Sequence, residues 1–337
     1  MKALAYHAAH ALKDFALAEV ELPMPSLQDG DVLVRVRAIS VNPVDTKVRA
    51  SRSGAAGRPV ILGWDVAGVI EKVGPAVTGW QAGDEVFYAG ALMRDGGNAE
   101  YQAVDHRVLA PKPKNLTFAE AAALPLTSIT AWEAVLEGEI GNYTKASKVL
   151  IIGGAGGVGS IATQLLKAAK GADAPRVFVT ASRPETREWC ERMGADVILN
   201  HRNDLAEELK AHGAEPGTLD VVFGTTHSKH YLKVIPDLLH AFGHFCLIDD
   251  PDVLDVVGFK RKAIRVHWEY MFAKTFWGYR PESQGAILRE VSKLVEAGKV
   301  KTTANLFLKG LTVENLRKAH ALLEAAESVG KIVIEVG

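Results

Sequence analysis

Cysteine is scarce in this chain of 337 residues, which has only Cys190 and Cys246. Two distant cysteines exclude a disulfide framework and favour a reducing, cytoplasmic location. No block of lysine and arginine stands out and the formal net charge is −1, so neither a nucleic acid nor a membrane surface is indicated as a partner. No apolar run is long enough to span a bilayer, and residues 1–6 turn polar too early for a signal peptide.

Candidate metal ligands are also few. A zinc site needs three or four convergent cysteine, histidine or acidic side chains. Two cysteines cannot form a four-thiolate site, and Gly243 between His240 and His244 indicates a helix end rather than one helical face. We interpret these histidines, and the pair His227 and His230, as surface or capping residues. We therefore expect no bound metal.

The chain is long enough for two domains, and its apolar content of 48% supports a large core. Short β-rich stretches separated by Gly/Pro turns fill the first third, which is typical of a mostly antiparallel, barrel-like domain. Strands and helices alternate from residue 148 onward, which predicts a doubly wound parallel sheet. We predict an α/β protein with a mostly β domain at 1–125 and 273–337 and a Rossmann domain at 126–272.

Local signals refine this prediction. Thr117 and Glu120 have the spacing of a capping box and open a helix that Pro125 interrupts. In the Rossmann domain we expect strands near 148–153, 176–181, 196–199, 220–223, 243–248 and 264–269. Helices are expected near 158–170, 184–193, 203–212 and 229–241.

A glycine-rich loop, Gly154-Ala155-Gly156-Gly157-Val158-Gly159, stands between the first of these strands and a helix. Strand, glycine turn and helix in this order form a dinucleotide site. Gly154 permits the tight turn, Gly156 lets backbone N–H groups approach a pyrophosphate, and Gly159 allows close packing of helix on strand. The N-terminus of the helix then attracts the phosphates.

The end of the second Rossmann strand favours NADPH over NADH. An NAD site places an acidic residue there to bind the ribose hydroxyls. This chain has Ser182 and Arg183 instead, with Arg187 one helical turn further on, whereas Asp173 precedes the strand. Arginine suits a 2′-phosphate because its planar fork matches the phosphate oxygens. Arg202, after the third strand, is a further candidate donor.

Four stretches in the expected order carry a family resemblance that spans essentially the whole chain. They are residues 41–49 (VNPVDTKVR), 63–68 (GWDVAG) and 124–132 (LPLTSITAW), and the glycine loop. The chain resembles the medium-chain dehydrogenase/reductase superfamily, and within it the zinc-free quinone oxidoreductase (zeta-crystallin-like) branch. The resemblance implies a GroES-like domain, a Rossmann domain and an active site in the cleft between them. It also implies a homodimer formed through the edge of the nucleotide-binding sheet.

The resemblance also implies positions for cofactor contacts. Asn42, Thr130 and Lys331 match positions at or near the nicotinamide end of NADPH, and Ile248 and Asp249 follow the fifth strand beside it. The remaining positions contact the pyrophosphate (Gly156, Gly157, Val158), the adenosine phosphate (Ser182, Arg183, His201) and the adenine and ribose (Thr226, His227). Zinc-dependent relatives carry a cysteine within the 42–45 segment, a histidine at position 64 and a second cysteine within 124–127, and this chain has none of these.

The implied reaction is hydride transfer from NADPH to a quinone or an α,β-unsaturated carbonyl. Without a metal, the developing oxyanion needs hydrogen-bond donors or a cation, and Lys47, Arg49 and Asn42 are the candidates. Lys47 stands where many relatives have a tyrosine, which argues against a tyrosyl proton donor. Asp45 and Asp65 are candidates to orient these groups or to relay protons. Alternatively, Asp45 and Arg49 form a structural ion pair and Asp65 binds backbone near a strand start.

Two other functions stay open at this point. One is a zinc-dependent alcohol dehydrogenase acting on alcohols or aldehydes. The other is an NADPH-binding protein without catalysis, with a structural or regulatory role. Elemental analysis separates the first from the zinc-free reductase, and a screen of acceptors with NADPH separates the second.

Overall fold

The structure is a computed structural model that describes residues 1–55 and 57–336. The chain divides into two compact units, Met1–Leu126 with Phe272–Ala297 and Thr302–Gly337, and Thr127–Met271 with Gly298–Lys301. The first unit is therefore discontinuous in sequence. The prediction treated 126–272 as one continuous domain, whereas this division adds 298–301 to the second unit. No helix in the described part of the chain is long and apolar enough to cross a bilayer.

The first unit is built mainly from antiparallel strands. One sheet has the order β15-β16-β3-β5-β6-β8 with β7 also paired to β3, and a smaller sheet has the order β2-β1-β4. Its strands are β1 (Lys2–Tyr6), β2 (Ala18–Glu21), β3 (Asp31–Val41), β4 (Val60–Ile61), β5 (Asp65–Val73), β6 (Glu85–Ala89), β7 (Tyr101–Asp105), β8 (Ala110–Pro111), β15 (Ala304–Lys309) and β16 (Lys331–Glu335). β3 is the centre of the unit, because β5, β7 and β16 all pair with it.

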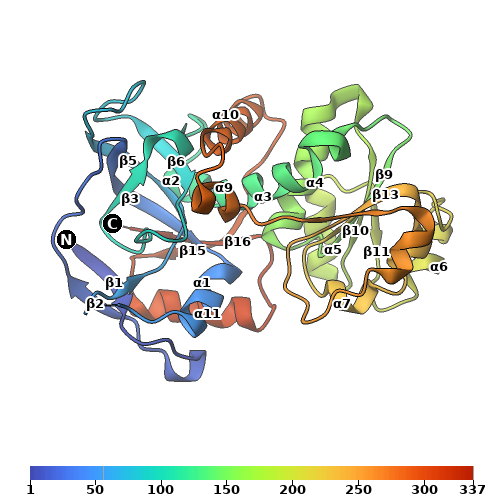
Figure 1. Cartoon of the computed structure of the whole chain (residues 1–337), viewed down its shortest axis with the longest axis horizontal. Coiled ribbons are helices and arrows are strands. Elements are labelled where there is room, and N and C mark those ends of the chain that lie inside the picture. The colour runs from blue at the N-terminus through green and yellow to red at the C-terminus, as the bar shows by residue number, and fades with distance from the viewer. Residues whose placement is uncertain (56, 337) are drawn as a thin grey trace. The chain divides into compact units, whose positions relative to one another are not determined.

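Helices cover this sheet and connect its distant parts. They are α1 (Pro43–Ser51), α2 (Phe118–Ala122), α9 (Phe272–Trp277), α10 (Glu282–Glu296) and α11 (Val313–Glu324), and α3 (Pro125–Val135) begins here. The capping box of Thr117 and Glu120 at the start of α2 is confirmed. α1 directly follows β3 and lies beside α11 (Figure 1). The segment after β3 is thus held by an element near the end of the chain.

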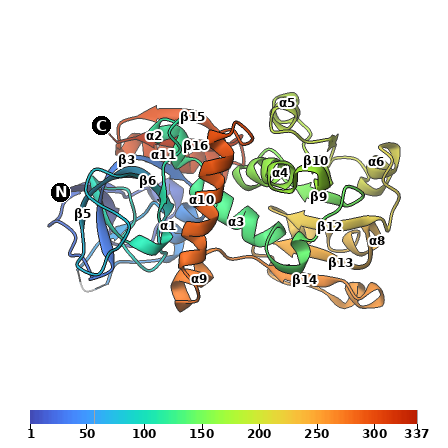
Figure 2. The same cartoon turned by 90° about the horizontal axis from the view of Figure 1, so that it is seen from above.

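The second unit is a parallel sheet with the order β11-β10-β9-β12-β13-β14. The strands are β9 (Lys148–Ile152), β10 (Arg176–Thr180), β11 (Val197–Leu199), β12 (Leu219–Gly224), β13 (Leu239–Leu247) and β14 (Arg265–Trp268). Figure 2 shows β10, β9, β12, β13 and β14 one after another in this order. β10 and β11 lie on one side of β9, whereas β12, β13 and β14 lie on the other, so the strand order reverses between β9 and β12. Sheets of this kind bind ligands at such a switch point. The predicted α/β fold class, a mostly β domain together with a doubly wound parallel sheet, is confirmed.

The helices of the second unit are α4 (Gly157–Lys170), α5 (Pro184–Arg192), α6 (Leu205–Ala211), α7 (Ser228–Tyr231) and α8 (Ile235–Leu238). The single helix predicted over 229–241 is wrong. Pro236 stands in the first turn of α8 and cannot donate the backbone hydrogen bond that would continue α7. Leu239 already belongs to β13, where it pairs with Leu219.

Candidate functional site

The glycine-rich loop connects the end of β9 to the start of α4. Thr180, the last residue of β10, holds the loop. Its Oγ1 accepts a hydrogen bond from the N–H of Gly153 at 2.9 Å, and its carbonyl accepts one from the N–H of Gly154 at 3.1 Å. Gly153 has a φ of +89°, in the left-handed region that favours glycine. The sequence analysis placed the tight turn at Gly154, whereas the left-handed residue is Gly153, one position earlier.

Three glycines of the loop differ in the space around them. A β-carbon on Gly154 would lie 2.6 Å from Cβ of Val179, and one on Gly159 would lie 2.3 Å from the carbonyl oxygen of Gly153. A β-carbon on Gly156, the N-cap of α4, would meet nothing closer than that same oxygen at 3.6 Å. Packing therefore requires glycine at positions 154 and 159. Gly156 instead leaves the first turn of α4, with Gly157 and Val158, open to an anion.

Cationic and imidazole side chains gather at the carboxyl ends of β10 and β11. Ser182 and Arg183 follow β10, and His201 and Arg202 follow β11. Burial lowers the pKa of His201, and the charges of Arg202, His227 and Arg183 lower it further. These groups are therefore close enough to interact. The structure brings together residues that the sequence analysis assigned to a phosphate pocket.

Arg183 of this cluster and Arg187 of the following helix already have partners within the chain. Nε of Arg183 lies 2.9 Å from Oε1 of Glu185, and the side chains of both residues are more than one third exposed. Nη1 of Arg187 donates to the carbonyl of Ala181 at 3.3 Å. An exposed ion pair of this kind is weak because water and salt screen it. Arg183 therefore keeps donors that a phosphate dianion can recruit.

The loops after β12 and β13 lie at the same edge of the sheet. Thr226 Oγ1 and His227 Nδ1 are 2.7 Å apart, and His227 has a φ of 53°, which is rare for a residue with a side chain. Oδ2 of Asp249 accepts a hydrogen bond from the N–H of Ser228 at 2.7 Å, and the N–H of Ile248 donates to the last carbonyl of β12 at 3.2 Å. The predicted residues Thr226, His227, Ile248 and Asp249 therefore follow the carboxyl ends of strands in this unit, where such ligands bind.

Four predicted residues of the first unit form one buried cluster. The side chains of Lys331 and Asp65 make an ion pair with Nζ 3.1 Å from Oδ2, and their exposed fractions are 4% and 0%. Nζ of Lys331 also donates to the carbonyl of Val41 at 3.1 Å and to Oδ1 of Asn42. Nδ2 of Asn42 donates to Oδ2 of Asp65 at 2.8 Å. Asp45 joins the cluster because its Oδ2 accepts from the N–H of Asn42 at 2.7 Å.

The two carboxylates of this cluster bind backbone as well. Oδ1 of Asp65 accepts from the N–H of Leu126, in the first turn of α3, at 2.7 Å, and Oδ1 of Asp45 accepts from the N–H of Gly63 at 2.9 Å. Burial raises the pKa of Asp45 to about 7, although the N–H groups of Asn42 and Gly63 and the charge of Lys331 oppose the rise. The suggestion that Asp65 binds backbone near a strand start agrees with this geometry. Leu126 was not expected to take part.

Arg49 lies in a separate network and does not pair with Asp45. Its side chain is 1% exposed, and it donates from Nε to the carbonyl of His10 at 3.2 Å and from Nη1 to Nδ1 of His320 at 2.9 Å. Nη2 forms an ion pair with Glu324 of α11. The sequence analysis did not single out His320 or Glu324. All donors named here point to structural partners, so the geometry favours a structural role for Arg49 over a catalytic one.

Lys47 and Thr130 complete the predicted set. Lys47 lies on α1 with an exposed side chain, unlike its neighbours Val48 and Arg49. Thr130 lies on α3 and is 5% exposed. Lys47 is therefore the residue of the predicted oxyanion group that presents a cationic side chain to the surface of its unit.

The positions that correspond to zinc ligands in metal-dependent relatives are occupied or engaged as follows. Trp64 is fully buried and its indole N–H donates to the carbonyl of Ala91 at 3.2 Å. Asn42 and Asp65 are engaged by Lys331, and Leu126 has no ligating side chain. Within residues 1–55 and 57–336, no three His, Cys, Asp or Glu side chains gather in a way that could hold a metal ion.

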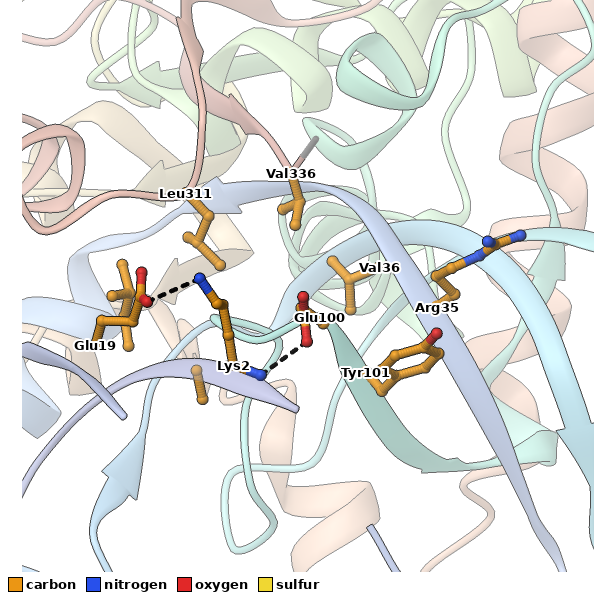
Figure 3. A pocket seen from close by; sticks show the side chains of 10 residues that line it. Lys2, Glu19, Arg35, Val36, Glu100, Tyr101, Leu311 and Val336 are labelled. Atoms are coloured by element: carbon orange, nitrogen blue, oxygen red, sulfur yellow. Dashed lines mark hydrogen bonds and ion pairs between the residues drawn. The ribbon is translucent and has the colours of Figure 1, made fainter. Parts of the chain in front are cut away.

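A cavity of about 260 Å³ lies elsewhere in the first unit (Figure 3). The charged groups at its rim interact with one another. Nζ of Lys2 lies 3.1 Å from Oε1 of Glu19, and the N–H of Lys2 donates to Glu100 at 2.7 Å. None of the predicted site residues lines it. We therefore do not assign the proposed chemistry to this cavity.

Comparison with known proteins identifies the class. Residues 28–114 match the model of the alcohol dehydrogenase GroES-like domain, and residues 157–276 match that of the zinc-binding dehydrogenases. The chain belongs to the medium-chain dehydrogenase/reductase family, and it is an oxidoreductase of that family.

Two relatives and one solved structure are similar to this chain over nearly its whole length. The chain is 39% identical to the zinc-type alcohol dehydrogenase-like protein SAS2087 of Staphylococcus aureus (strain MSSA476), with 100% of both chains covered. It is 32% identical to the chloroplastic NADPH-dependent alkenal/one oxidoreductase of Arabidopsis thaliana, over 95% of this chain and 76% of that protein. A crystal structure from Rhizobium etli CFN 42, described provisionally as a zinc-dependent alcohol dehydrogenase, superimposes with a TM-score of 0.94 at 45% identity and covers 100% and 98% of the two chains.

Proposed function

We propose that this protein transfers hydride from NADPH to an α,β-unsaturated carbonyl compound, quinones included, without a bound metal ion. When bound, NADPH supplies the hydride from C4 of its nicotinamide ring. The residues of the chain bind the dinucleotide, orient it and provide positive charge for the acceptor oxygen.

The single observation that carries the proposal is the cluster at the carboxyl ends of β10 and β11. An NAD site would place a carboxylate at the end of β10, where it would repel a 2′-phosphate. Arg183 stands there instead, and its charge lowers the pKa of the nearby His201, as do the charges of Arg202 and His227. Such a group of donors and cations favours a dianionic phosphate. The NADPH dependence of the Arabidopsis relative supports the same assignment.

The acceptor class is supported by the relatives and by Lys47. Hydride addition to an enone or a quinone moves negative charge onto oxygen, which a nearby cation stabilises. Lys47 is a cation on the exposed side of α1, and Arg49 of the same helix forms an ion pair with Glu324. The Arabidopsis relative is named for alkenal and enone substrates.

Independence from metal is part of the proposal, although the family model of the second unit is that of zinc-binding dehydrogenases. Zinc takes cysteine, histidine or carboxylate ligands. In the expected segments this chain offers the amide of Asn42, the carboxylate of Asp45, the buried indole of Trp64 and the sequence LPLT at 124–127. Both oxygens of Asp45 already accept backbone N–H groups, from Asn42 and Gly63. The nearby carboxylate of Asp65 is neutralised by Lys331. This donor set does not fit zinc, so no step of the proposed reaction passes through a metal.

The test compares two charge reversals in the second unit. Arg183→Glu places a carboxylate in the cluster, and Arg261→Glu makes the same charge change at an exposed arginine outside it. Loss of a charge-assisted hydrogen bond costs about 1.5–3 kcal/mol. We therefore expect Arg183→Glu to lower kcat/KM for NADPH by roughly 10- to 150-fold, with little change for NADH and little effect of Arg261→Glu. Equal losses with both coenzymes would contradict the assignment.

An acceptor screen and elemental analysis test the other two parts. We expect turnover of enones and quinones that survives dialysis against a chelator. Activity that is lost on chelation and restored only by Zn²⁺ would favour the alcohol dehydrogenase alternative. Tight NADPH binding without turnover of any acceptor would favour a non-catalytic role.

We also propose that the protein is a cytoplasmic homodimer. β14 is an edge strand of its sheet, and an edge strand can pair with a strand of a second copy. Burial raises the pKa of Cys190 to about 12, and both cysteines are free, which suits a reducing compartment. Light scattering that gives the mass of a single chain would contradict the dimer.

A further inference from the structure

Lys331 has a complete set of acceptors inside the protein. Its ammonium group carries three N–H donors, and it binds the carbonyl of Val41, Oδ1 of Asn42 and Oδ2 of Asp65. The residue is 4% exposed. The sequence analysis assigned it to the cofactor, yet no donor of the ammonium group is left for a dinucleotide. Its function must therefore act through the residues that it binds.

The first of these residues is Asn42, the N-cap of α1. Its amide orientation is fixed from both ends, because Oδ1 faces the ammonium group while Nδ2 donates to Oδ2 of Asp65 at 2.8 Å and to the carbonyl of Ser40 at 3.3 Å. The opposite orientation would place the amide NH₂ group against the ammonium group. The side chain of Asn42 makes no cap hydrogen bond to α1 itself. Lys331 instead holds the junction between β3 and α1, through the carbonyl of Val41 and Oδ1 of Asn42, and α1 carries Lys47.

The second residue is Asp65 at the start of β5. One of its oxygens binds both Lys331 and Asn42, and the other accepts the N–H of Leu126 at 2.7 Å. The buried cluster therefore fixes the start of β16, the β3–α1 junction, the start of β5 and the start of α3. These segments are distant in sequence, and polar bonds join them at one place.

Stability alone does not explain such a cluster. Taking an ammonium group and a carboxylate out of water costs about as much as their attraction returns, and apolar residues of similar volume often stabilise a protein equally well. What a bonded set of charges adds is a single geometry, because each donor has one acceptor within reach. The cluster is thus suited to hold a neighbouring group in a fixed position.

We propose that Lys331 is a positioning residue for the reaction: through Asn42 it fixes the start of α1 and so places the cation of Lys47 toward the acceptor oxygen. This deepens the proposed function and rests on it for the identity of the reaction. It differs from the sequence-based assignment, in which Lys331 contacts the cofactor directly. It also differs from a purely structural role, in which the folded protein would not need this geometry for turnover.

The test uses the charge-balanced variant Lys331→Met/Asp65→Asn, with Lys318→Met, at an exposed position of α11, as control. Lys331→Met alone would leave Asp65 buried without a counter-charge and is expected to unfold easily. In the double variant the new amide keeps an acceptor for Leu126, and the side chain of Asn42 is free to turn over. A displacement of catalytic groups by about 1 Å costs on the order of 100-fold in rate.

We expect the double variant to fold with an unchanged KM for NADPH and with kcat lowered roughly 10- to 100-fold. A raised KM for NADPH with unchanged kcat would overturn the proposal in favour of direct cofactor contact. Wild-type kinetics in a stably folded double variant would overturn it in favour of a structural role.

A crystal structure of the double variant tests the proposal without a measurement of turnover. We expect a turned Asn42 amide and a displaced start of α1, and an unmoved α1 and Lys47 would overturn the proposal. If wild-type protein reduces no enone or quinone, the proposed function fails, and this structural comparison still decides the positioning role.

Discussion

The glycine loop offers a direct experiment, because one of its glycines has room for a methyl group and another has none. Gly156→Ala adds a β-carbon whose nearest neighbour is the carbonyl oxygen of Gly153 at 3.6 Å, an ordinary contact. Gly159→Ala adds one only 2.3 Å from that oxygen and 2.9 Å from Cα of Gly154. Both obstacles are backbone atoms, so no side chain can rotate away. The first change therefore probes ligand approach and the second probes the fold.

The magnitudes follow from these contacts. For Gly159→Ala, overpacking costs about 1–3 kcal/mol, and more where backbone must move, while the better helix propensity of alanine returns about 1 kcal/mol. The loop cannot shift freely, because Thr180 binds the N–H groups of Gly153 and Gly154. For Gly156→Ala, alanine is the poorer N-cap by about 0.5–1 kcal/mol, and its stiffer unfolded chain returns about 0.4–1 kcal/mol. We expect the free energy of unfolding to fall clearly for Gly159→Ala and to stay within about 1 kcal/mol for Gly156→Ala.

Cofactor binding should rank the variants differently. In Gly156→Ala the methyl group occupies the open side of the α4 N-terminus, where a pyrophosphate would approach. We expect NADPH affinity to fall about tenfold or more, which corresponds to about 1.4 kcal/mol or more. Urea unfolding and calorimetric titration with NADPH measure the two effects separately. A Gly156→Ala protein that binds NADPH as well as the wild type, or a Gly159→Ala protein of unchanged stability, would refute the reasoning.

Other predictions concern the network of Arg49. Arg49→Met should cost about 1–3 kcal/mol in the free energy of unfolding, because it leaves the buried acceptor of His320 without its donor; a stable but inactive variant would instead support the catalytic role that the sequence suggested. Burial and Arg49 lower the pKa of His320 to about 3, whereas an unfolded histidine has a pKa near 6.5. The unfolded chain therefore takes up this proton first, and stability should fall as the pH drops below about 6.5, by about 2 kcal/mol at pH 5. His320→Gln should remove that slope in urea unfolding measured at pH 7 and pH 5, and an unchanged slope would contradict the assignment.

The Rossmann half of the fold was predictable because its signals are local. An apolar strand, a glycine loop and a helix follow one another in sequence, and alternating strands and helices dictate a parallel sheet. The helix predicted over 229–241 failed where local signals conflict. Apolar residues continue past Pro236, but the proline starts a new short helix and the residues from Leu239 onward gain more by pairing with β12. Tertiary pairing thus overrode a helical pattern.

The cluster of the first unit was only partly predictable. The resemblance pointed to Asn42, Asp65 and Lys331 one at a time, but Lys331 bonds with groups 266 and 289 residues away along the chain. No spacing rule reaches that far. The role of the backbone N–H of Leu126 could not be predicted for another reason, because almost any residue type supplies the same donor. The proline before it was the available signal, because proline at the start of a helix leaves the next N–H groups in need of an acceptor.

α1 shows how the two buried networks act together. It has nine residues, and a helix so short is marginal on its own. Its N-terminus is fixed by Asn42, which Lys331 and Asp65 hold, and its last turn is fixed by Arg49, which Glu324 holds. Its first end is thus held by buried charges from β16 and β5, and its last turn by the buried Arg49 and the more exposed Glu324 of α11. Lys47 lies between them with its side chain exposed. A short helix tied at both ends has little freedom to tilt or fray, so the position of this cation is set by residues that are remote in sequence.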